Sequence, residues 1–311
     1  MCSEKVKRVL KVATMDIDTV KTDVYDCYSP YIDGRCEKIF FRINNGCLKD
    51  FVKEIVGNEQ TSYITYVNEL IKSGYVPRKI SVLCKDVCKR LDDEDNSRIK
   101  AASCEVLSSQ ILNFFECPTV FNKMVKGELD CETRYSVMSV DFLSYGEDIV
   151  TMDDIGCRFT GLCAAIHTIK ESMLVYEDEY SEDQIERVIE DFVYSYLIRK
   201  LLLGDFDFIP VNVGIIENKE KGTLQLINFD FEGSFNGRYP LAKYDLMYCK
   251  DNYPKVYDRF VSKFMELYNG IESLRNKCEL DIDSMGCESN YEHLLDTMDS
   301  LYDMCSLDLS K

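Results

Sequence analysis

A long helical pattern that runs into two short apolar segments is the feature that most constrains the fold of this chain. Between residues 183 and 203, apolar residues recur at three- and four-residue spacing, and Gly204 follows as a usual signal for the end of a helix. Residues 208–216 and 224–229 are short apolar runs joined by a polar turn. We therefore expect an amphipathic helix followed by a β-hairpin.

The segments on either side of this unit predict a mixture of strands and helices. We expect a strand at residues 38–43, a helix at 51–73, a strand or a helix at 78–90, an exposed acidic loop at 92–96, a helix from 97 to the residue before Cys117, paired strands at 119–125 and 134–142, and helices from 241 to 307. This order predicts an α+β fold in two lobes, with a boundary near residues 141–146. Residues 1–141 would form a mixed N-lobe with a small sheet, and residues 142–311 a mainly helical C-lobe that carries the hairpin.

The charge balance limits the partners of the chain. Its 311 residues include 55 Asp and Glu against 37 Lys and Arg, which gives a formal net charge of −18. Binding to nucleic acid needs a basic surface that displaces counterions from phosphates, and this surface mostly repels polyanions. We therefore do not expect nucleic acid as a partner.

The start of the chain and its cysteines indicate the compartment. The first eight residues are charged, and nowhere do 18 uncharged apolar residues follow one another, so we expect an unexported, cytoplasmic protein without a membrane span. The 15 cysteines are scattered, with Cys84 and Cys88 the closest pair, and there are two histidines, His167 and His293. This pattern supports neither a zinc site nor a disulfide framework. We expect reduced cysteines that act as small apolar residues, and a structural role for His167 in its apolar stretch.

The predicted hairpin carries the residues that could perform chemistry. Asp207 lies in the loop before the hairpin, Asn212 follows five positions later, and Asp230 comes at the exit of the second strand. In metal-assisted phosphoryl transfer, one carboxylate engages the attacking hydroxyl, while an amide oxygen and a second carboxylate hold Mg²⁺. The alternative is a chance pattern in an Asp-rich chain, with Asn212 serving a turn. For the neighbouring Asp205 we expect a solvated or capping role.

The order of these residues resembles the HipA-like kinases, which are relatives of the two-lobed protein kinases. The matching positions are Gly204, Asp207, Asn212, Gly214 and the run from 230 to 237. Upstream, residues 135–149 look like the strand and hinge segment of the family, and residues 103–112 look like its N-lobe helix with Glu105. The resemblance covers about residues 97 to 245, roughly half of the chain.

The resemblance implies a protein-kinase-like fold and an ATP- and Mg²⁺-dependent phosphotransferase that acts on a Ser or Thr hydroxyl group of a protein substrate. It implies the catalytic acid Asp207, the metal ligands Asn212 and Asp230, Glu105 as partner of the cation that anchors the phosphates, and a hinge beside adenine that includes Val137, Met138 and Val140. The anchoring cation would be Arg42, at a position where the family usually has Lys, with Lys38, Lys85 and Lys100 as alternatives.

Two departures from the family keep other functions open. Ile209 stands where the family has a His, and no glycine-rich phosphate loop of the G-x-G-x-x-G type is present, so residues 31–35 would have to cover the phosphates. The rival hypothesis is a catalytically inactive kinase-like module that binds a nucleotide or a protein. A third is a kinase relative that acts on lipids or small molecules.

Overall fold

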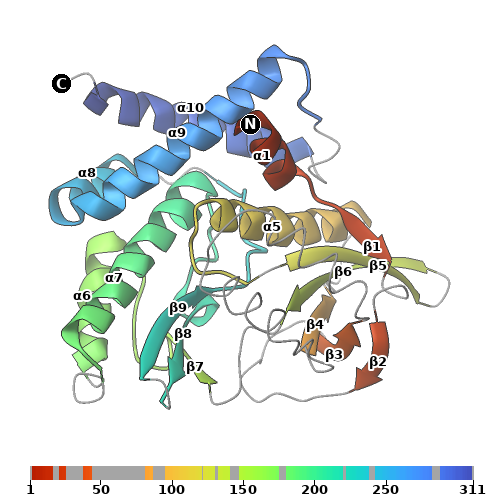
Figure 1. The fold of residues 1–311 in the computed structure, drawn as a ribbon, viewed down its shortest axis with the longest axis horizontal. Coiled ribbons are helices and arrows are strands. Elements are labelled where there is room, and N and C mark those ends of the chain that lie inside the picture. Colours follow the sequence, from red (N-terminus) through yellow and green to blue (C-terminus); the bar gives the residue numbers. More distant parts are fainter. Residues whose placement is uncertain are drawn as a thin grey trace.

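The structure is a computed structural model that describes most of the chain in segments. These are residues 2–16, 21–25, 38–43, 81–86, 95–120, 122–129, 132–140, 147–174, 180–219, 222–237, 242–281 and 288–309. The predicted helix at 51–73, the loop at 31–35 and the lobe boundary at 141–146 lie outside the described residues and stay predictions. The described part is a mixed α+β fold (Figure 1).

Six strands form the larger sheet, in the order β1-β5-β6-β4-β3-β2. They are β1 (Thr14–Asp16), β2 (Lys21–Tyr25), β3 (Lys38–Ile43), β4 (Ser81–Asp86), β5 (Asn122–Leu129) and β6 (Glu132–Val140). The β1–β5 pair is parallel and the other pairs are antiparallel. The predicted strand at 38–43 and the predicted strand pair β5–β6 are confirmed. Within the ambiguous segment at 78–90, the described residues Ser81–Asp86 form a strand.

Helix α5 (Asp95–Phe114) follows β4 in the chain and packs against β5 and β6 of the larger sheet. Its apolar face is fully buried, as the sequence pattern predicts, with Val106, Leu107 and Ile111 in the core. Glu116 then adopts a left-handed backbone conformation with φ of 58°, and the Cys117 N–H donates to the carbonyl oxygen of Leu112 at 2.9 Å. This closing turn ends the helix before Pro118.

The smaller sheet contains the predicted hairpin and one strand more. Strand β8 (Val213–Asn218) pairs antiparallel with β9 (Thr223–Asn228) on one side and with β7 (Glu147–Thr151) on the other. The hairpin is confirmed, although β8 begins at Val213 and not at residue 208. Pro210 has no backbone N–H to donate and opens a 3₁₀ turn, Pro210–Asn212, that delays the strand. Strand β7 was not predicted.

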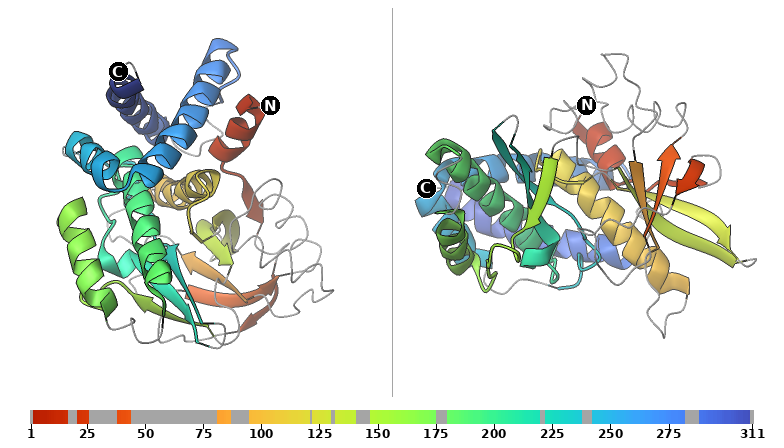
Figure 2. Two further views of the ribbon diagram at one scale, coloured as in Figure 1. Left: turned by 60° about the vertical axis from the view of Figure 1, so that its left-hand side comes forward. Right: turned by 90° about the horizontal axis from the view of Figure 1, so that it is seen from below.

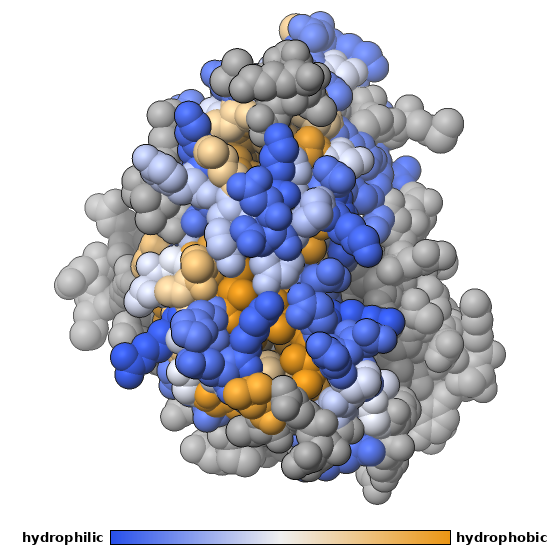
Figure 3. All heavy atoms as spheres, turned by 90° about the vertical axis from the view of Figure 1, so that its left-hand side faces the viewer, coloured by the Kyte–Doolittle hydropathy of each residue, from blue (hydrophilic) through white to orange (hydrophobic). Residues whose placement is uncertain are grey.

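Helices cover this smaller sheet and extend away from it (Figure 2). They are α6 (Leu162–Met173), α7 (Glu182–Tyr196), a π-helical continuation of α7 (Leu197–Leu202), α8 (Ala242–Asn252), α9 (Pro254–Asn276) and α10 (Glu288–Leu309). Ser181 and Gln184 form a capping box that starts α7. The long helix before Gly204 and the helical end of the chain are confirmed, whereas α6 was not predicted. The face that carries α6, α7 and α8 is largely hydrophilic with separate apolar patches (Figure 3).

Helix α1 (Cys2–Leu10) joins the start of the chain to its last third. It contacts α9 and α5 (Figure 1), and it lies close to α9 at Gly270, where an added Cβ would be 2.4 Å from Cγ2 of Val6. The Lys5 ammonium pairs with the Glu266 carboxylate at 3.4 Å. Glycine is therefore required at this crossing, because any side chain would push the two helices apart.

Several smaller predictions are tested by the described side chains. Seven cysteines of the described part are free, and five of these are buried: Cys104, Cys117, Cys157, Cys249 and Cys305. The structural role expected for His167 is wrong, because the ring is exposed and lies 3.6 Å from the Glu171 carboxylate. Among the described residues, no helix is long and apolar enough to cross a membrane.

Candidate functional site

The loop between the π-helical turn and β8 is tied down at its first residues. Gly204 has φ of 56°, and a Cβ there would lie 2.2 Å from the carbonyl oxygen of Gly237, so glycine is required on both counts. The side chain of Asp205 is fully buried. Its carboxylate accepts hydrogen bonds from the backbone N–H of Asp207 at 2.9 Å and from Nε of Arg199 at 2.7 Å. The position of Asp207 is thus fixed through a buried neighbour.

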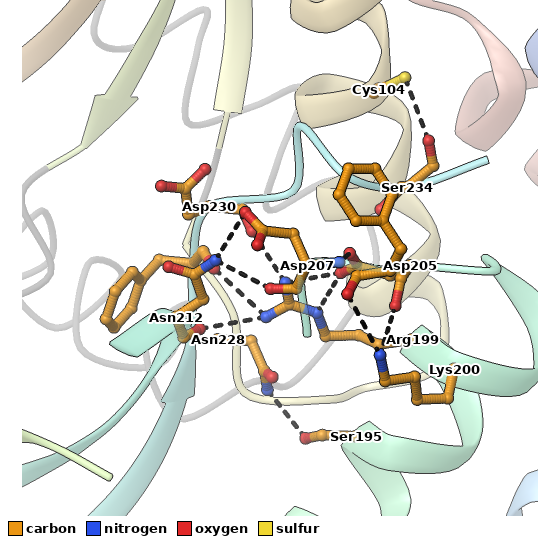
Figure 4. Close-up of polar contacts among 12 residues, drawn as sticks. Cys104, Ser195, Arg199, Lys200, Asp205, Asp207, Asn212, Asn228, Asp230 and Ser234 are labelled. Carbon is orange, nitrogen blue, oxygen red and sulfur yellow. Dashed lines mark hydrogen bonds and ion pairs between the residues drawn. The ribbon is translucent and has the colours of Figure 1, made fainter. Parts of the chain in front are cut away.

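Arg199, in the π-helical turn, connects the loop to the end of the hairpin. Its guanidinium pairs with Asp205 at 2.6 Å and donates to the carbonyl oxygens of Asn212 (3.1 Å), Phe229 (3.2 Å) and Asp230 (2.8 Å). A planar guanidinium can serve several acceptors from one side chain, which an ammonium cannot do with the same geometry. One buried cation therefore holds together the two segments that carry the predicted catalytic and metal-binding residues (Figure 4).

Two aromatic rings enclose this cation. The guanidinium carbon lies 4.8 Å from the ring centre of Phe208 and 4.6 Å from that of Phe231. Both rings are buried, so the charge of Arg199 is removed from water and stabilised by carboxylate, carbonyl and π contacts together. The prediction that Asp205 is a solvated or capping residue is wrong, because Arg199 recruits it into the interior.

The three residues predicted for chemistry lie close together, where the loop before β8 meets the exit of β9. The Asn212 side-chain N–H₂ donates to the carbonyl oxygen of Asp207 at 2.9 Å and to its carboxylate at 3.3 Å. Figure 4 shows Asp207, Asn212 and Asp230 side by side. Burial, and after it the charges of Asp230 and Asp205, raise the pKa of the Asp207 carboxyl above its ordinary value, while Asn212 and Arg199 act in the opposite direction.

The chain around Asp230 makes this proximity possible. Asp230 has φ of 59°, a left-handed conformation that turns the chain at the exit of β9. Gly233 lies against the loop, since an added Cβ would be 2.5 Å from Cβ of Asp207 and 2.9 Å from the Asp205 carboxylate. A larger residue at 233 would separate the two segments that Arg199 joins.

Asn228 links the same hairpin to the segment after α5. Its side-chain N–H₂ donates to the carbonyl oxygen of Pro118 and to the hydroxyl of Ser195, both at 2.8 Å. The backbone carbonyl oxygen of Asn228 accepts a hydrogen bond from the backbone N–H of Val120 at 3.0 Å. Thr119 forms a parallel bridge with Asn228. The segment 118–120, which follows α5, is thereby fixed to Asn228, two positions before Asp230 in the chain.

Glu105 of α5 lies beside the exit of the hairpin. It is 2% exposed and accepts a hydrogen bond from Nδ2 of Asn122 at 3.2 Å. Its carboxylate, with those of Asp230 and Glu232, forms a cluster in which the ligand atoms lie within 4.8 Å of one another. Glu232 was not singled out from the sequence, although it stands two positions after Asp230. The two-residue spacing between Asp230 and Glu232 places a second carboxylate on the same turn, and this spacing could have identified Glu232 as a candidate.

The predicted nucleotide-binding residues lie on neighbouring strands. Val137 and Met138 of β6 are buried, and the backbone of Val140 pairs with that of Val82 in β4. Of the candidate cations, Lys85 of β4 stands opposite Val137 in the register. Arg42 belongs to β3, one strand further from β6 and opposite Ser81, and Lys38 is on the same strand. The side chains of Val140, Arg42, Lys38 and Lys85 lie outside the described part, whereas Lys100 lies half-buried near the start of α5.

Comparisons with known proteins support the fold. No protein-family model and no curated protein matches the sequence. Among solved structures, the crystal structure of the Helicobacter pylori proinflammatory kinase CtkA is similar, with a TM-score of 0.53 and 13% sequence identity over 96% of this chain and 99% of that chain. At this level of identity the likeness concerns the fold alone. The chain has a kinase-like fold.

Proposed function

We propose that this protein is an ATP- and Mg²⁺-dependent phosphotransferase that transfers a phosphoryl group to a Ser or Thr hydroxyl group of a protein. The observation that carries the proposal is the connection made by Arg199, which holds the segment of Asp207 and Asn212 against the segment of Asp230. Phosphoryl transfer needs one carboxylate that engages the acceptor hydroxyl and two oxygen ligands for the metal, all close to the transferred phosphate, and these three residues carry such groups. A similar kinase structure over almost the whole chain supports the same proposal.

In this proposal Asp207 orients the acceptor hydroxyl and accepts its proton. The carboxylate is half-buried and anchored by the Asn212 amide, so it is held in one position. Its pKa is raised by burial and by the charge of Asp230, which makes it a stronger base than an ordinary Asp. The proton that leaves the hydroxyl would reside on this carboxylate.

The residues present fit a magnesium ion. The N–H₂ of Asn212 is directed to Asp207, so the carbonyl oxygen of the Asn212 amide is the atom that can bind a cation. Arg199 contacts Asp230 through its backbone carbonyl oxygen, and the side-chain carboxylate would be the group that binds the metal. Oxygen ligands of this kind suit Mg²⁺, which when bound would neutralise charge on the phosphates. Glu105 and Glu232 add negative charge nearby that a cation would balance.

The proposal includes the two-lobed arrangement. The six-stranded sheet with α5 would be the N-lobe, and the smaller sheet with its helices the C-lobe. ATP would lie between them, with adenine beside residues 137–140 of β6 and its phosphates directed to Asn212 and Asp230. The protein substrate would present its hydroxyl to Asp207 from the solvent side of the loop.

We expect ATP with Mg²⁺ to stabilise the protein against thermal unfolding. Saturation at about 100 times the dissociation constant adds about 2.7 kcal/mol to the free energy of unfolding. Asp230→Asn weakens one metal ligand and should reduce the Mg²⁺-dependent part of the thermal shift, measured by differential scanning fluorimetry. Asp251→Asn, an exposed residue of α8, should leave the shift unchanged.

The rival hypothesis gives a different pattern in this assay. An inactive kinase-like module would show a shift that does not depend on Mg²⁺ and no phosphate transfer by the unmutated chain. The absence of a shift with ATP, GTP or their diphosphates would contradict nucleotide binding altogether.

We expect Lys85, rather than Arg42, to anchor the phosphates. Strand β4 is the direct neighbour of β6, at about 4.8 Å, and it precedes α5 in the chain, whereas β3 is two strands away from β6 at about twice that distance. Lys85→Met should therefore abolish most of the ATP-dependent thermal shift, and Arg42→Met should preserve it. The opposite ranking of the two variants would restore Arg42 as the anchor.

A further inference from the structure

The loop that carries Asp207 exposes apolar side chains to solvent. Among the described residues, six large apolar side chains are exposed, and three of them belong to this loop: Phe206 (61%), Ile209 (39%) and Val211 (43%). We call these three residues the apolar collar. Single exposed apolar residues are common on protein surfaces, but three within six positions around a candidate catalytic acid are a concentrated patch.

The collar is held outward by the contacts of the residues between its members and of the residue that follows them. Phe208 is buried against the Arg199 guanidinium, and Asn212 is buried through its bonds to Asp207. The backbone N–H of Phe206 donates to the carbonyl oxygen of Gly233 at 3.2 Å. The loop is therefore held at both ends and in its middle, and its outward side chains remain in contact with water.

The loop that carries the collar has little charge of its own, although Asp230 and Glu232 bring negative charge beside Asp207. From Phe206 to Val211, Asp207 is the sole ionisable residue of the sequence. The nearby Lys200 ammonium donates to the carbonyl oxygens of Asp205 at 2.9 Å and of Phe206 at 3.5 Å, so it adds a positive charge to the loop. A substrate with Lys or Arg directly beside its hydroxyl would place these charged side chains against the apolar side chains of the collar.

We propose that the apolar collar selects protein substrates in which the acceptor Ser or Thr is flanked on both sides by apolar, uncharged residues. The inference rests on the proposed function, because the acceptor hydroxyl is placed at Asp207. Phe206 precedes Asp207 in the loop, and Ile209 and Val211 follow it, so apolar groups flank a polar centre. An extended peptide with a hydroxyl between two apolar side chains has the complementary pattern.

Other occupants fit this pattern less well. A lipid surface would bury the Asp207 carboxylate among apolar chains, which disfavours its charged form. A sugar or nucleoside offers hydroxyl groups but lacks apolar flanks. A second copy of the chain could cover the collar, and the test below includes that outcome.

The test uses the full chain and two synthetic peptides with a central Ser. In one peptide the two residues on each side of the Ser are Leu and Val, and in the other the same four positions are Lys. Phosphate transfer from ATP with Mg²⁺ gives kcat/KM for each, and fluorescently labelled versions with Ala in place of Ser give dissociation constants without chemistry. We expect the apolar peptide to be favoured by at least about tenfold in both measurements, the size of effect that apolar contacts supply.

Variants assign the preference to the collar. Phe206→Ser and Val211→Ser, which lie on opposite sides of Asp207, should each weaken binding of the apolar Ala peptide by roughly tenfold. Met247→Ser removes an apolar residue of α8 that is exposed to a similar degree, 53%, and should leave binding unchanged. Circular dichroism and the unfolding temperature confirm that each variant is folded.

The outcomes separate the inference from the proposed function. Equal binding of the two Ala peptides, or a loss of binding in Met247→Ser equal to that in Phe206→Ser, overturns the inference. So does a wild-type dimer in sedimentation velocity that Phe206→Ser converts to a monomer. A preference for the apolar peptide without any thermal shift by ATP would support the collar as a peptide site and reject the kinase proposal, whereas an ATP shift without the preference would reject the collar alone.

Discussion

Replacing Asp207 by Asn is expected to lower the rate of phosphate transfer by about 10²–10⁴-fold, the contribution of a positioned general base. The Asn side chain has almost the same shape, so Asn212 and Asp230 keep their places. Its amide cannot take up the hydroxyl proton. The thermal shift by ATP with Mg²⁺ should therefore remain in Asp207→Asn, in contrast to Asp230→Asn. Transfer is measured with labelled ATP, and intrinsic ATP hydrolysis serves as a second readout.

The same substitution is expected to stabilise the folded protein in metal-free buffer. Burial and the charges of Asp230 and Asp205 raise the folded-state pKa of Asp207. A group with a raised pKa contributes stability below its unfolded pKa, and that contribution is lost as pH rises through the folded pKa. Above the folded-state pKa the wild type has lost this contribution, whereas the Asn side chain of Asp207→Asn carries no charge that Asp230 and Asp205 could repel. A variant that is both inactive and less stable would instead indicate a structural role for Asp207.

Replacing Arg199 by Met is expected to lower the free energy of unfolding by about 3–5 kcal/mol, because it leaves the buried carboxylate of Asp205 without its partner. It also removes the hydrogen bonds to the carbonyl oxygens of Asn212, Phe229 and Asp230. The variant should therefore lose the Mg²⁺-dependent part of the ATP shift, although Arg199 contacts the two proposed metal-binding residues only through their backbone carbonyl oxygens. Urea unfolding of the metal-free chain measures the first effect, and fluorimetry the second.

A double variant distinguishes the buried charge from the general loss of packing. Arg199→Met with Asp205→Leu removes both charges and should recover part of the unfolding free energy, but not the ATP shift, because the loop remains unconnected to the hairpin. Arg187→Met, an exposed position on α7, is the control and should change stability by less than about 0.5 kcal/mol. If Arg199→Met changed the free energy of unfolding as little as Arg187→Met, the contacts of Arg199 would not contribute to stability.

The catalytic candidates could be found in the sequence because they stand in one short stretch. Asp207, Asn212 and Asp230 follow a helix and a hairpin whose patterns are local, and local patterns can be read along the chain. Arg199 and Asp205 could not be assigned in the same way. Whether a charged residue is solvated or buried depends on the partner that faces it, and the Arg199 contacts include residues up to 31 positions away. The exposure of His167 depends in the same way on what packs around α6.

The fold shows a similar division between local and distant information. Helix α5 and the pair β5–β6 were predicted because their apolar spacing repeats over many residues. Strand β7 was missed, since it is short and acquires its role by pairing with β8, more than 60 positions later in the chain. In the proposed function, the choice of the cation that would anchor the phosphates depends on which strand lies beside β6. The sheet order, absent from any local pattern, favours Lys85 over Arg42.

The contact between α1 and α9 imposes a delay on the folding of the newly synthesised chain. Lys5 and Glu266 are 261 positions apart. Because ribosomes add about 5–20 residues per second, α1 waits roughly 13–50 s for α9 to be translated. Its other contact, α5, is made much earlier and covers it on one side. During this interval Val6, which ends up against Gly270, lacks its final partner, and the growing chain offers an apolar segment to chaperones that bind such segments.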